Sequence, residues 1–190
     1  MARAVGLVAA SVAVGMFVTS ERGQRLDAEL FAAANRNRGP KADAFFSGIT
    51  ELGSIWASAA AAAVLAARGQ RSAASRGLAA ASTTWLFGQG LKQLFVRRRP
   101  YLADREGTRL LIDEPRGTSW PSSHPAVLLA FTTAAGRTAG IGRGAQAALT
   151  ALAAAVGASR IYLGVHYPGD VAGGLLLGEA IGELFADDAG

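Results

Sequence analysis

Six apolar stretches, each close to the length of a bilayer crossing, constrain the fold of this chain more than any other feature. A membrane-spanning helix needs about 17–25 mostly apolar residues, because each residue advances the helix by ~1.5 Å. We therefore predict an all-α fold, an integral-membrane bundle of six transmembrane helices that forms a single domain over residues 1–190. The predicted spans are residues 3–20, 44–67, 73–96, 122–139, 143–162 and 168–186.

The composition supports a membrane protein and removes several alternatives. Hydrophobic residues make up 51% of the chain, which is high for a soluble domain. Lys and Arg number 19 against 14 acidic residues, an excess that would also fit a nucleic-acid binder. Here the charges lie between long apolar stretches, so we expect a basic membrane protein with no nucleic-acid partner. The chain has no cysteine, which excludes disulfides, thiolate metal ligands and cysteine nucleophiles.

The first apolar stretch and the segment after it each allow two interpretations. One Arg before an apolar run with small residues also fits a secretory signal peptide. We favour the first helix of a bundle because five more apolar stretches follow. In the segment 21–43, Leu26, Leu30 and Phe31 recur at helical spacing among charges, which favours a short helix at the membrane interface. A solvated loop with one amphipathic turn is the alternative.

The last apolar stretch carries a repeat of small residues. Gly174, Gly178 and Gly182 recur every four residues and predict a stripe on which another helix can pack closely. Glu179 lies in the same stretch, where a carboxylate needs a partner or a polar cavity. The polar segment 97–119 is predicted to be a loop outside the membrane.

Three motifs carry residues suited to an anion, and the first ends the third stretch as "KQLFVRRRP". Lys92 and Arg99 are seven residues apart, so a helix continuing through both would place them on nearly the same face. Pro100 is expected to end that helix. A run of arginines beside a span is also typical of side chains that anchor in lipid headgroups. Lys92 is harder to explain in that way because it lies inside the apolar stretch.

The second motif, "TSWPSSHPAVLLAF", opens the fourth stretch. Ser122 before an apolar run predicts the N-terminus of a helix. The exposed N–H groups and the positive dipole end of such a helix attract an anion, and the Ser122 hydroxyl would extend that site. His124 would stand beside the anion. A capped helix with a surface histidine is the alternative interpretation.

The third motif, "GASRIYLGVHYPGDVAGG", joins the fifth and sixth stretches. Arg160 can bind two phosphate oxygens through its guanidinium. Asp170 follows His166 closely enough to accept a hydrogen bond from one ring nitrogen, which would fix the tautomer and leave the other nitrogen free to attack. Taken alone, His-x₃-Asp is a weak signal, and Pro168 is a natural helix start. In a six-span bundle, however, all three motifs open to the same side of the membrane.

With these motifs the chain resembles the type-2 phosphatidate phosphatase superfamily of lipid phosphate phosphatases. The signature of that family is K-x₆-R-P, then P-S-G-H, then S-R-x₅-H-x₃-D. The matching residues of this chain are Lys92 to Arg99-Pro100, Pro121-Ser122-Ser123-His124, and Ser159-Arg160 to His166 to Asp170. Ser123 stands where the family commonly has Gly, which reaches positive φ more readily, so we expect the backbone contact of this loop to differ.

The resemblance implies a role for each of these positions. His166 would be the nucleophile that forms a phosphohistidine, Asp170 would orient it, and His124 would protonate the leaving oxygen. No metal or other cofactor is then required, because positioning and charge stabilisation dominate phosphoryl transfer. The residues implied to hold the phosphoryl oxygens are Lys92, Arg99, Ser122, Ser123 and Arg160.

These observations predict a membrane phosphatase whose substrate is a lipid phosphate monoester or diphosphate. Polyprenyl diphosphate, a prenyl-linked sugar phosphate, phosphatidylglycerophosphate and phosphatidate all remain open as substrates. A lipid phosphotransferase with the same site is an alternative. A non-enzymatic membrane transporter or scaffold is another, since Glu51, Gln89 and Glu179 lie within apolar segments. A metalloenzyme that uses His124, His166 and Asp170 as ligands is a third.

The orientation in the membrane is predicted against one argument from charge. Six of the nineteen Lys and Arg lie on the side of the termini and the other thirteen on the motif side. The positive-inside rule would therefore place the motifs in the cytoplasm. Several of the thirteen are assigned to phosphate, and the resemblance implies an active site on the extracytoplasmic face of a bacterial cytoplasmic membrane. We follow the resemblance.

Overall fold

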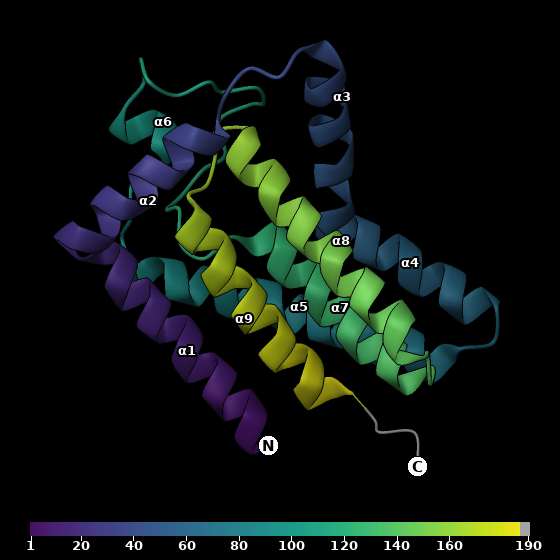
Figure 1. The fold of residues 1–190 in the computed structure, drawn as a ribbon. Coiled ribbons are helices and arrows are strands. Elements are labelled where there is room, and N and C mark those ends of the chain that lie inside the picture. Colours follow the sequence, from purple (N-terminus) through teal and green to yellow (C-terminus); the bar gives the residue numbers. More distant parts are fainter. Residues whose placement is uncertain (187–190) are drawn as a thin grey trace.

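The computed structural model describes residues 1–186, and this part of the chain consists of helices and connecting segments without a strand. The all-α prediction is confirmed for these residues. The elements are α1 (Ala2–Thr19), α2 (Glu21–Ala34), α3 (Pro40–Ile49), the 3₁₀ turn η1 (Thr50–Gly53), α4 (Ile55–Ala67), α5 (Arg71–Leu94), α6 (Pro100–Ala103), α7 (Ser123–Thr138), α8 (Arg143–Tyr162) and α9 (Pro168–Phe185), arranged as in Figure 1.

Each predicted span coincides with a helix or a pair of helices, but the number of membrane crossings is not established by the helices themselves. Within residues 1–186, only α1 is by itself long and apolar enough to cross a membrane. The stretch 44–67 would make a second crossing if α3–η1 and α4, which bend by 64°, form one broken span. Charged residues within α5 and α9, and the 16-residue length of α7, weaken the apolar signal of the others. Six crossings therefore stay a prediction.

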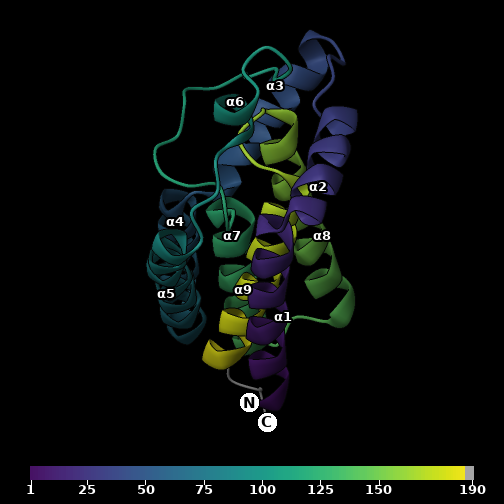
Figure 2. The same cartoon turned by 90° about the vertical axis from the view of Figure 1, so that its left-hand side faces the viewer.

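Helix α7 is the centre of the bundle. All of its residues from Pro125 to Gly136 are buried. Helices α5 and α9 pack on α7, α1 packs along α9, and α4 packs mainly on α5 (Figures 1 and 2). Ser11 of α1 donates its hydroxyl to the carbonyl of Gly173 at 2.8 Å. Residues 2–19 are thus packed as a helix of the bundle, which is the interpretation favoured for this segment.

The glycine stripe of α9 packs on α7, which confirms the prediction from its spacing. A Cβ added at Gly174 would lie 2.3 Å from the carbonyl oxygen of Ser122, and one at Gly178 would lie 2.3 Å from that of Ala126. The two backbones therefore touch. This contact carries the start of α9 to the start of α7, where the Ser122 N–H donates to the carbonyl of Asp170 at 3.0 Å.

Segments from distant parts of the sequence gather at one end of the bundle. Figure 2 shows α2, α3, α6 and the chain between α6 and α7 at the end remote from the N-terminus. The first residues of α7 and α9 lie at this end as well. Of the two interpretations of the segment 21–43, the helix is the one found, although Phe31 alone of its three apolar residues is buried while Leu26 and Leu30 are about half exposed.

Large apolar side chains remain exposed on the outer helices. Trp56 of α4 is 80% exposed, and Phe17 of α1 and Leu86 of α5 are also exposed. Soluble proteins rarely leave many such side chains in water, because burying them is favourable. These surfaces are therefore suited to contact lipid.

Candidate active site

The first motif does not continue as one helix, contrary to the prediction. Helix α5 ends at Leu94, and Pro100 begins α6. The intervening backbone leaves the helix because a residue before proline is disfavoured in the helical region, and Arg99 is extended. Lys92 and Arg99 nevertheless act on each other electrostatically, so they converge from the helix and from the segment after it.

The segment 95–99 separates its arginines by alternation. In extended backbone, successive side chains point to opposite sides. Arg97 and Arg99 are buried, 6% and 2% exposed, whereas Arg98 between them is exposed. The Arg97 carbonyl accepts the N–H of Ser119 at 2.9 Å, which joins this segment to the chain that enters α7. Of the three arginines, only Arg98 is placed as a headgroup anchor would be.

Arg99 reaches the ring of His166. Its Nη1 lies 3.1 Å from Nε2 of His166 and donates to the carbonyl of Val165 at 2.9 Å. Its Nε donates to the carbonyl of Gly117 at 3.0 Å. A guanidinium can only donate hydrogen bonds, so the Nε2 that faces it is an acceptor and the ring proton belongs on Nδ1. The site thus holds the tautomer that leaves a lone pair on Nε2.

Asp170 lies beside Nδ1 of His166 but makes no hydrogen bond to it, which corrects the predicted contact. Nδ1 and Oδ2 are 3.5 Å apart, beyond ordinary hydrogen-bond length. The same oxygen already accepts the N–H of Tyr167 at 2.8 Å and the hydroxyl of Ser119. Asp170 therefore caps the start of α9 as well as facing the imidazole, and this capping holds it in place.

His166 is an uncharged imidazole at neutral pH. The ring lies in the turn between α8 and α9 and is 2% exposed. Burial lowers the pKa of His166 to about 3, although Asp170 acts in the opposite direction. Desolvation penalises the charged form, and the neutral form carries the lone pair that a nucleophile needs.

Five polar groups from the second and third motifs are buried without a hydrogen-bond partner in the described part of the chain. They are the hydroxyls of Ser122 and Ser123, the Nε of Arg160, Nε1 of Trp120 and Nδ1 of His166. Arg160 also donates from Nη1 to Thr50 of η1 at 2.9 Å, which orients its guanidinium. Ser122 precedes α7 without capping it by its side chain. Buried polar groups are rarely left unpaired, and hydroxyls, a guanidinium and a helix N-terminus are all donors suited to a phosphate.

His124 joins the second motif to the other two. It is the second residue of α7, and a Cβ added at Gly53 of η1 would lie 2.7 Å from its Cβ. The charged or titratable groups that act on it electrostatically include Arg160, His166 and Lys92. The three motifs therefore meet at one end of the bundle.

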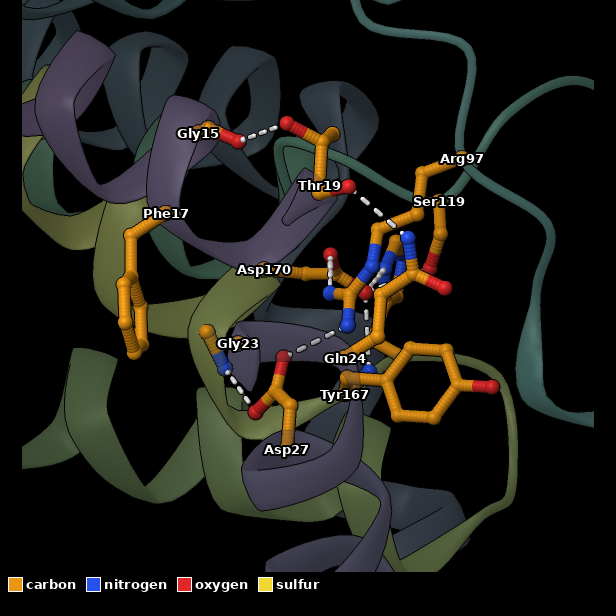
Figure 3. Close-up of polar contacts among 12 residues, drawn as sticks. Gly15, Phe17, Thr19, Gly23, Gln24, Asp27, Arg97, Ser119, Tyr167 and Asp170 are labelled. Atoms are coloured by element: carbon orange, nitrogen blue, oxygen red, sulfur yellow. Dashed lines mark hydrogen bonds and ion pairs between the residues drawn. The ribbon is translucent and has the colours of Figure 1, made fainter. Parts of the chain in front are cut away.

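Sequence reasoning missed the residues that support this site from outside. Arg97 belongs to the run of arginines that is typical of headgroup anchors, but it binds Asp170 and Asp27 of α2 (Figure 3). Ser119 and Thr50 orient Asp170 and Arg160. The only sequence signal was the position of Arg97 two residues before Arg99 in a segment that precedes proline. Within residues 1–186, no three His, Asp or Glu side chains gather as metal ligands, so His124, His166 and Asp170 do not form the ligand set considered above.

Comparison with known families identifies this arrangement. The sequence model of the PAP2 superfamily matches residues 72–187, which include all three motifs. The chain belongs to this superfamily. It is 35% identical over 94 residues to the decaprenylphosphoryl-5-phosphoribose phosphatase of Mycobacterium tuberculosis, in strain CDC 1551 / Oshkosh and in strain ATCC 25618 / H37Rv. That match covers 50% of this chain and 49% of the relative, so the chain spans about half the length of the curated relatives it matches.

Two solved structures share the fold, and the first of them is of a PAP2-type protein. The transmembrane phosphatidylglycerolphosphate phosphatase of Bacillus subtilis superposes with a TM-score of 0.80 at 24% identity, over 97% of this chain and 94% of that one. Aquifex aeolicus LpxE gives a TM-score of 0.73 at 27% identity, over 83% of this chain and 92% of that one. The PAP2 fold therefore extends over the helices that precede the matched residues as well.

Proposed function

We propose that this PAP2 protein is an integral-membrane lipid phosphatase that cleaves a phosphate ester or anhydride through a phosphohistidine on His166. One observation carries the proposal. The neutral, buried imidazole of His166 presents a lone pair on Nε2 at 3.1 Å from Arg99, in a site where buried hydroxyl and guanidinium donors have no protein partner. A phosphoryl group would satisfy those donors and meet the nucleophile in one place.

In the first step the substrate phosphoryl group binds to the cations of the site. Arg99 transfers its Nη1 donor from Nε2 to a phosphoryl oxygen, which frees the lone pair of His166. Nε2 then attacks phosphorus while the bond to the leaving oxygen breaks, and His124, which the negative charge of the bound phosphoryl group keeps protonated, gives its proton to that oxygen. Asp170 stabilises the positive charge that develops on the ring. Lys92 and Arg160 offset the charge on the phosphoryl oxygens.

The second step releases phosphate. Water attacks the phosphorus of the phosphohistidine, and His124, now neutral, accepts a proton from it. The P–N bond breaks, its electron pair returns to Nε2, and inorganic phosphate leaves. His166 is again neutral and His124 again protonated, so the cycle closes without a net change in the protein.

Among the lipid classes that remain open, we infer a prenyl-linked sugar phosphate as the preferred substrate. The support is the 35% identity to a phosphatase named for decaprenylphosphoryl-5-phosphoribose. Phosphate release by the purified protein should be measured on that class, a polyprenyl diphosphate, phosphatidylglycerophosphate and phosphatidate. We expect the highest kcat/KM for the prenyl-linked sugar phosphate and no loss of rate with a chelator. A preference for phosphatidate would refute the substrate, transfer to a lipid hydroxyl in place of phosphate release would indicate a transferase, and no turnover of any phosphate would refute the enzyme.

The same proposal includes six membrane crossings by α1, α3–η1–α4, α5, α7, α8 and α9. The exposed apolar side chains of the outer helices support it. Two of the three residues that favoured a transporter, Glu51 and Glu179, are explained without a transport path. Glu51 is exposed, and Glu179 accepts from Thr133 at 2.9 Å and pairs with Arg3 at 3.3 Å. These two partners explain how the carboxylate of Glu179 is tolerated between packed helices.

We place the site on the extracytoplasmic face, which single-cysteine labelling can test. Ser72→Cys and Glu106→Cys substitute exposed residues at opposite ends of the bundle. Glu106 is preferable to Gly107, where an added Cβ would meet the Asp104 carboxylate. A membrane-impermeant thiol reagent on intact cells should label Glu106→Cys and should label Ser72→Cys only after permeabilisation. The reverse pattern would place the site in the cytoplasm, and the parent chain is a clean control because it has no cysteine.

A further inference from the structure

Asp170 is held from outside the active site by a chain of two charged residues. Nη1 of Arg97 lies 2.6 Å from Oδ1 of Asp170, and Nη2 lies 2.8 Å from Oδ2 of Asp27 on α2 (Figure 3). Both carboxylates and the guanidinium are almost fully buried, at 0%, 4% and 6% exposure. The guanidinium also stacks on the ring of Tyr167, with its central carbon 4.2 Å from the ring centroid. Neither of the two proposed reaction steps uses Arg97 or Asp27.

Asp27 contacts the start of α9 as well as Arg97. Its Oδ1 accepts the N–H of Gly169 at 2.8 Å. Gly169 precedes Asp170 directly, and an added Cβ there would lie 2.7 Å from Oδ2 of Asp27. One carboxylate of α2 therefore touches both the backbone next to Asp170 and the cation that binds the Asp170 side chain.

We propose that Arg97 and Asp27 are positioning residues that hold Asp170 against His166, so that α2 is part of the catalytic apparatus. The proposal rests on the proposed function, in which the ring of His166 becomes positively charged beside Asp170. Arg97 occupies Oδ1 and leaves Oδ2 for Ser119, Tyr167 and the imidazole. With Oδ1 fixed, the carboxylate cannot rotate about its Cβ–Cγ bond.

The carboxylate of Asp27 is needed because Arg97 would otherwise have an acidic partner at only one of its two Nη nitrogens. A buried guanidinium carries N–H groups on both Nη1 and Nη2, and leaving one of these nitrogens unpaired in a site of low dielectric costs folding free energy. Asp27 lies at ion-pair distance from Nη2, and its negative charge offsets part of the attraction between Arg97 and Asp170. Asp170 thus keeps more of its charge for the imidazole. Lys could supply the charge of Arg97 but not two separate nitrogens in one plane, one for each carboxylate.

Steady-state kinetics can distinguish positioning from substrate binding. In Arg97→Gln, kcat is expected to fall about 10–100-fold, the range known for outer partners of a reacting group, while KM changes less than about twofold. Arg97→Lys should restore part of kcat, and Asp27→Asn should lower kcat less than Arg97→Gln does. The matched controls are Arg98→Gln and Glu29→Gln, which remove the same charges from exposed neighbours. A rise in KM with unchanged kcat would show that Arg97 binds substrate and would overturn the proposal.

The double variant tests whether Asp27 acts through Arg97. If it does, Asp27→Asn should add little to the loss already caused by Arg97→Gln, because the two share one path. Losses in kcat that multiply would mean that Asp27 acts independently and would refute the connection from α2. If Arg97→Gln does not fold, the same comparison is made with Arg97→Lys.

A readout independent of turnover separates this proposal from the proposed function. The chain has only two histidines, so a ¹⁵N-histidine spectrum of the full protein in detergent micelles contains two imidazoles. Arg97→Gln and Asp27→Asn should both shift the ring nitrogens of His166 and leave those of His124 unchanged, whereas the two control variants should shift neither. Unchanged His166 signals in both variants would overturn the positioning role even in an active enzyme. Shifted signals in a protein without phosphatase activity would uphold the contact and refute the proposed function instead.

Discussion

Replacing His166 with alanine is expected to lower phosphate release by about 10⁴-fold or more and to abolish the covalent phosphoenzyme. The imidazole supplies the nucleophile of the proposed mechanism, and Arg99 fixes its lone pair on Nε2. Without it, the cations can still bind the phosphoryl group but nothing in the site attacks phosphorus. The measurement is release of phosphate from labelled lipid, together with acid-labile, alkali-stable label on the protein after rapid quenching.

His124→Ala is the matched comparison because it removes the other of the two histidines. With a lipid substrate its rate should also fall, since the leaving oxygen is no longer protonated. With p-nitrophenyl phosphate, whose leaving group needs little protonation, the phosphoenzyme should still form and should accumulate, because its hydrolysis lacks a base. Phosphoenzyme in His166→Ala, or its loss in His124→Ala with this substrate, would reverse the assignment of the two rings.

The site residues could be predicted from the sequence because they belong to local motifs with fixed internal spacing. Lys92, Arg99, Arg160, His124 and His166 could each be located from a short run of residues. The topology of a helical bundle then placed the ends of non-adjacent helices together. The close packing face of α9 could also be predicted from a short run of residues, since glycines four residues apart lie on the same face of a helix.

The features that sequence reasoning missed depend on contacts between distant segments. The role of Arg97 follows from Asp27, 70 positions earlier, and from Asp170, 73 positions later. No periodicity connects three such residues. The end of α5 at Leu94 was missed because the predicted helix was continued to Pro100, whereas the chain leaves the helix earlier so that alternate arginines can enter the core. Hydropathy alone does not give the number of crossings for a related reason. Charged residues that face the site lower the mean hydropathy of the helices that carry them.

Asp170→Asn is expected to lower kcat by about 10³–10⁴-fold with little change in KM, and to destabilise the start of α9. The amide has nearly the same shape but no charge to stabilise the imidazolium. It also has only one acceptor oxygen, whereas both oxygens of Asp170 accept from donors. If the amide oxygen faces Arg97, its NH₂ group meets the N–H of Tyr167, and one buried donor is left unpaired at a cost of ~1–3 kcal/mol.

The two consequences of Asp170→Asn can be measured separately. Thermal unfolding reports the lost cap, and single-turnover formation of the phosphoenzyme reports the attack by His166. Asp113→Asn, the same change at an exposed residue of the polar loop, is the control for the loss of charge. Vanadate, which mimics the pentacoordinate phosphorus, should still bind to Asp170→Asn because Arg99 and Arg160 are intact. A variant that binds vanadate and forms the phosphoenzyme at the parental rate would mean that Asp170 only caps α9, and the imidazole would then depend on Arg99 alone for its orientation.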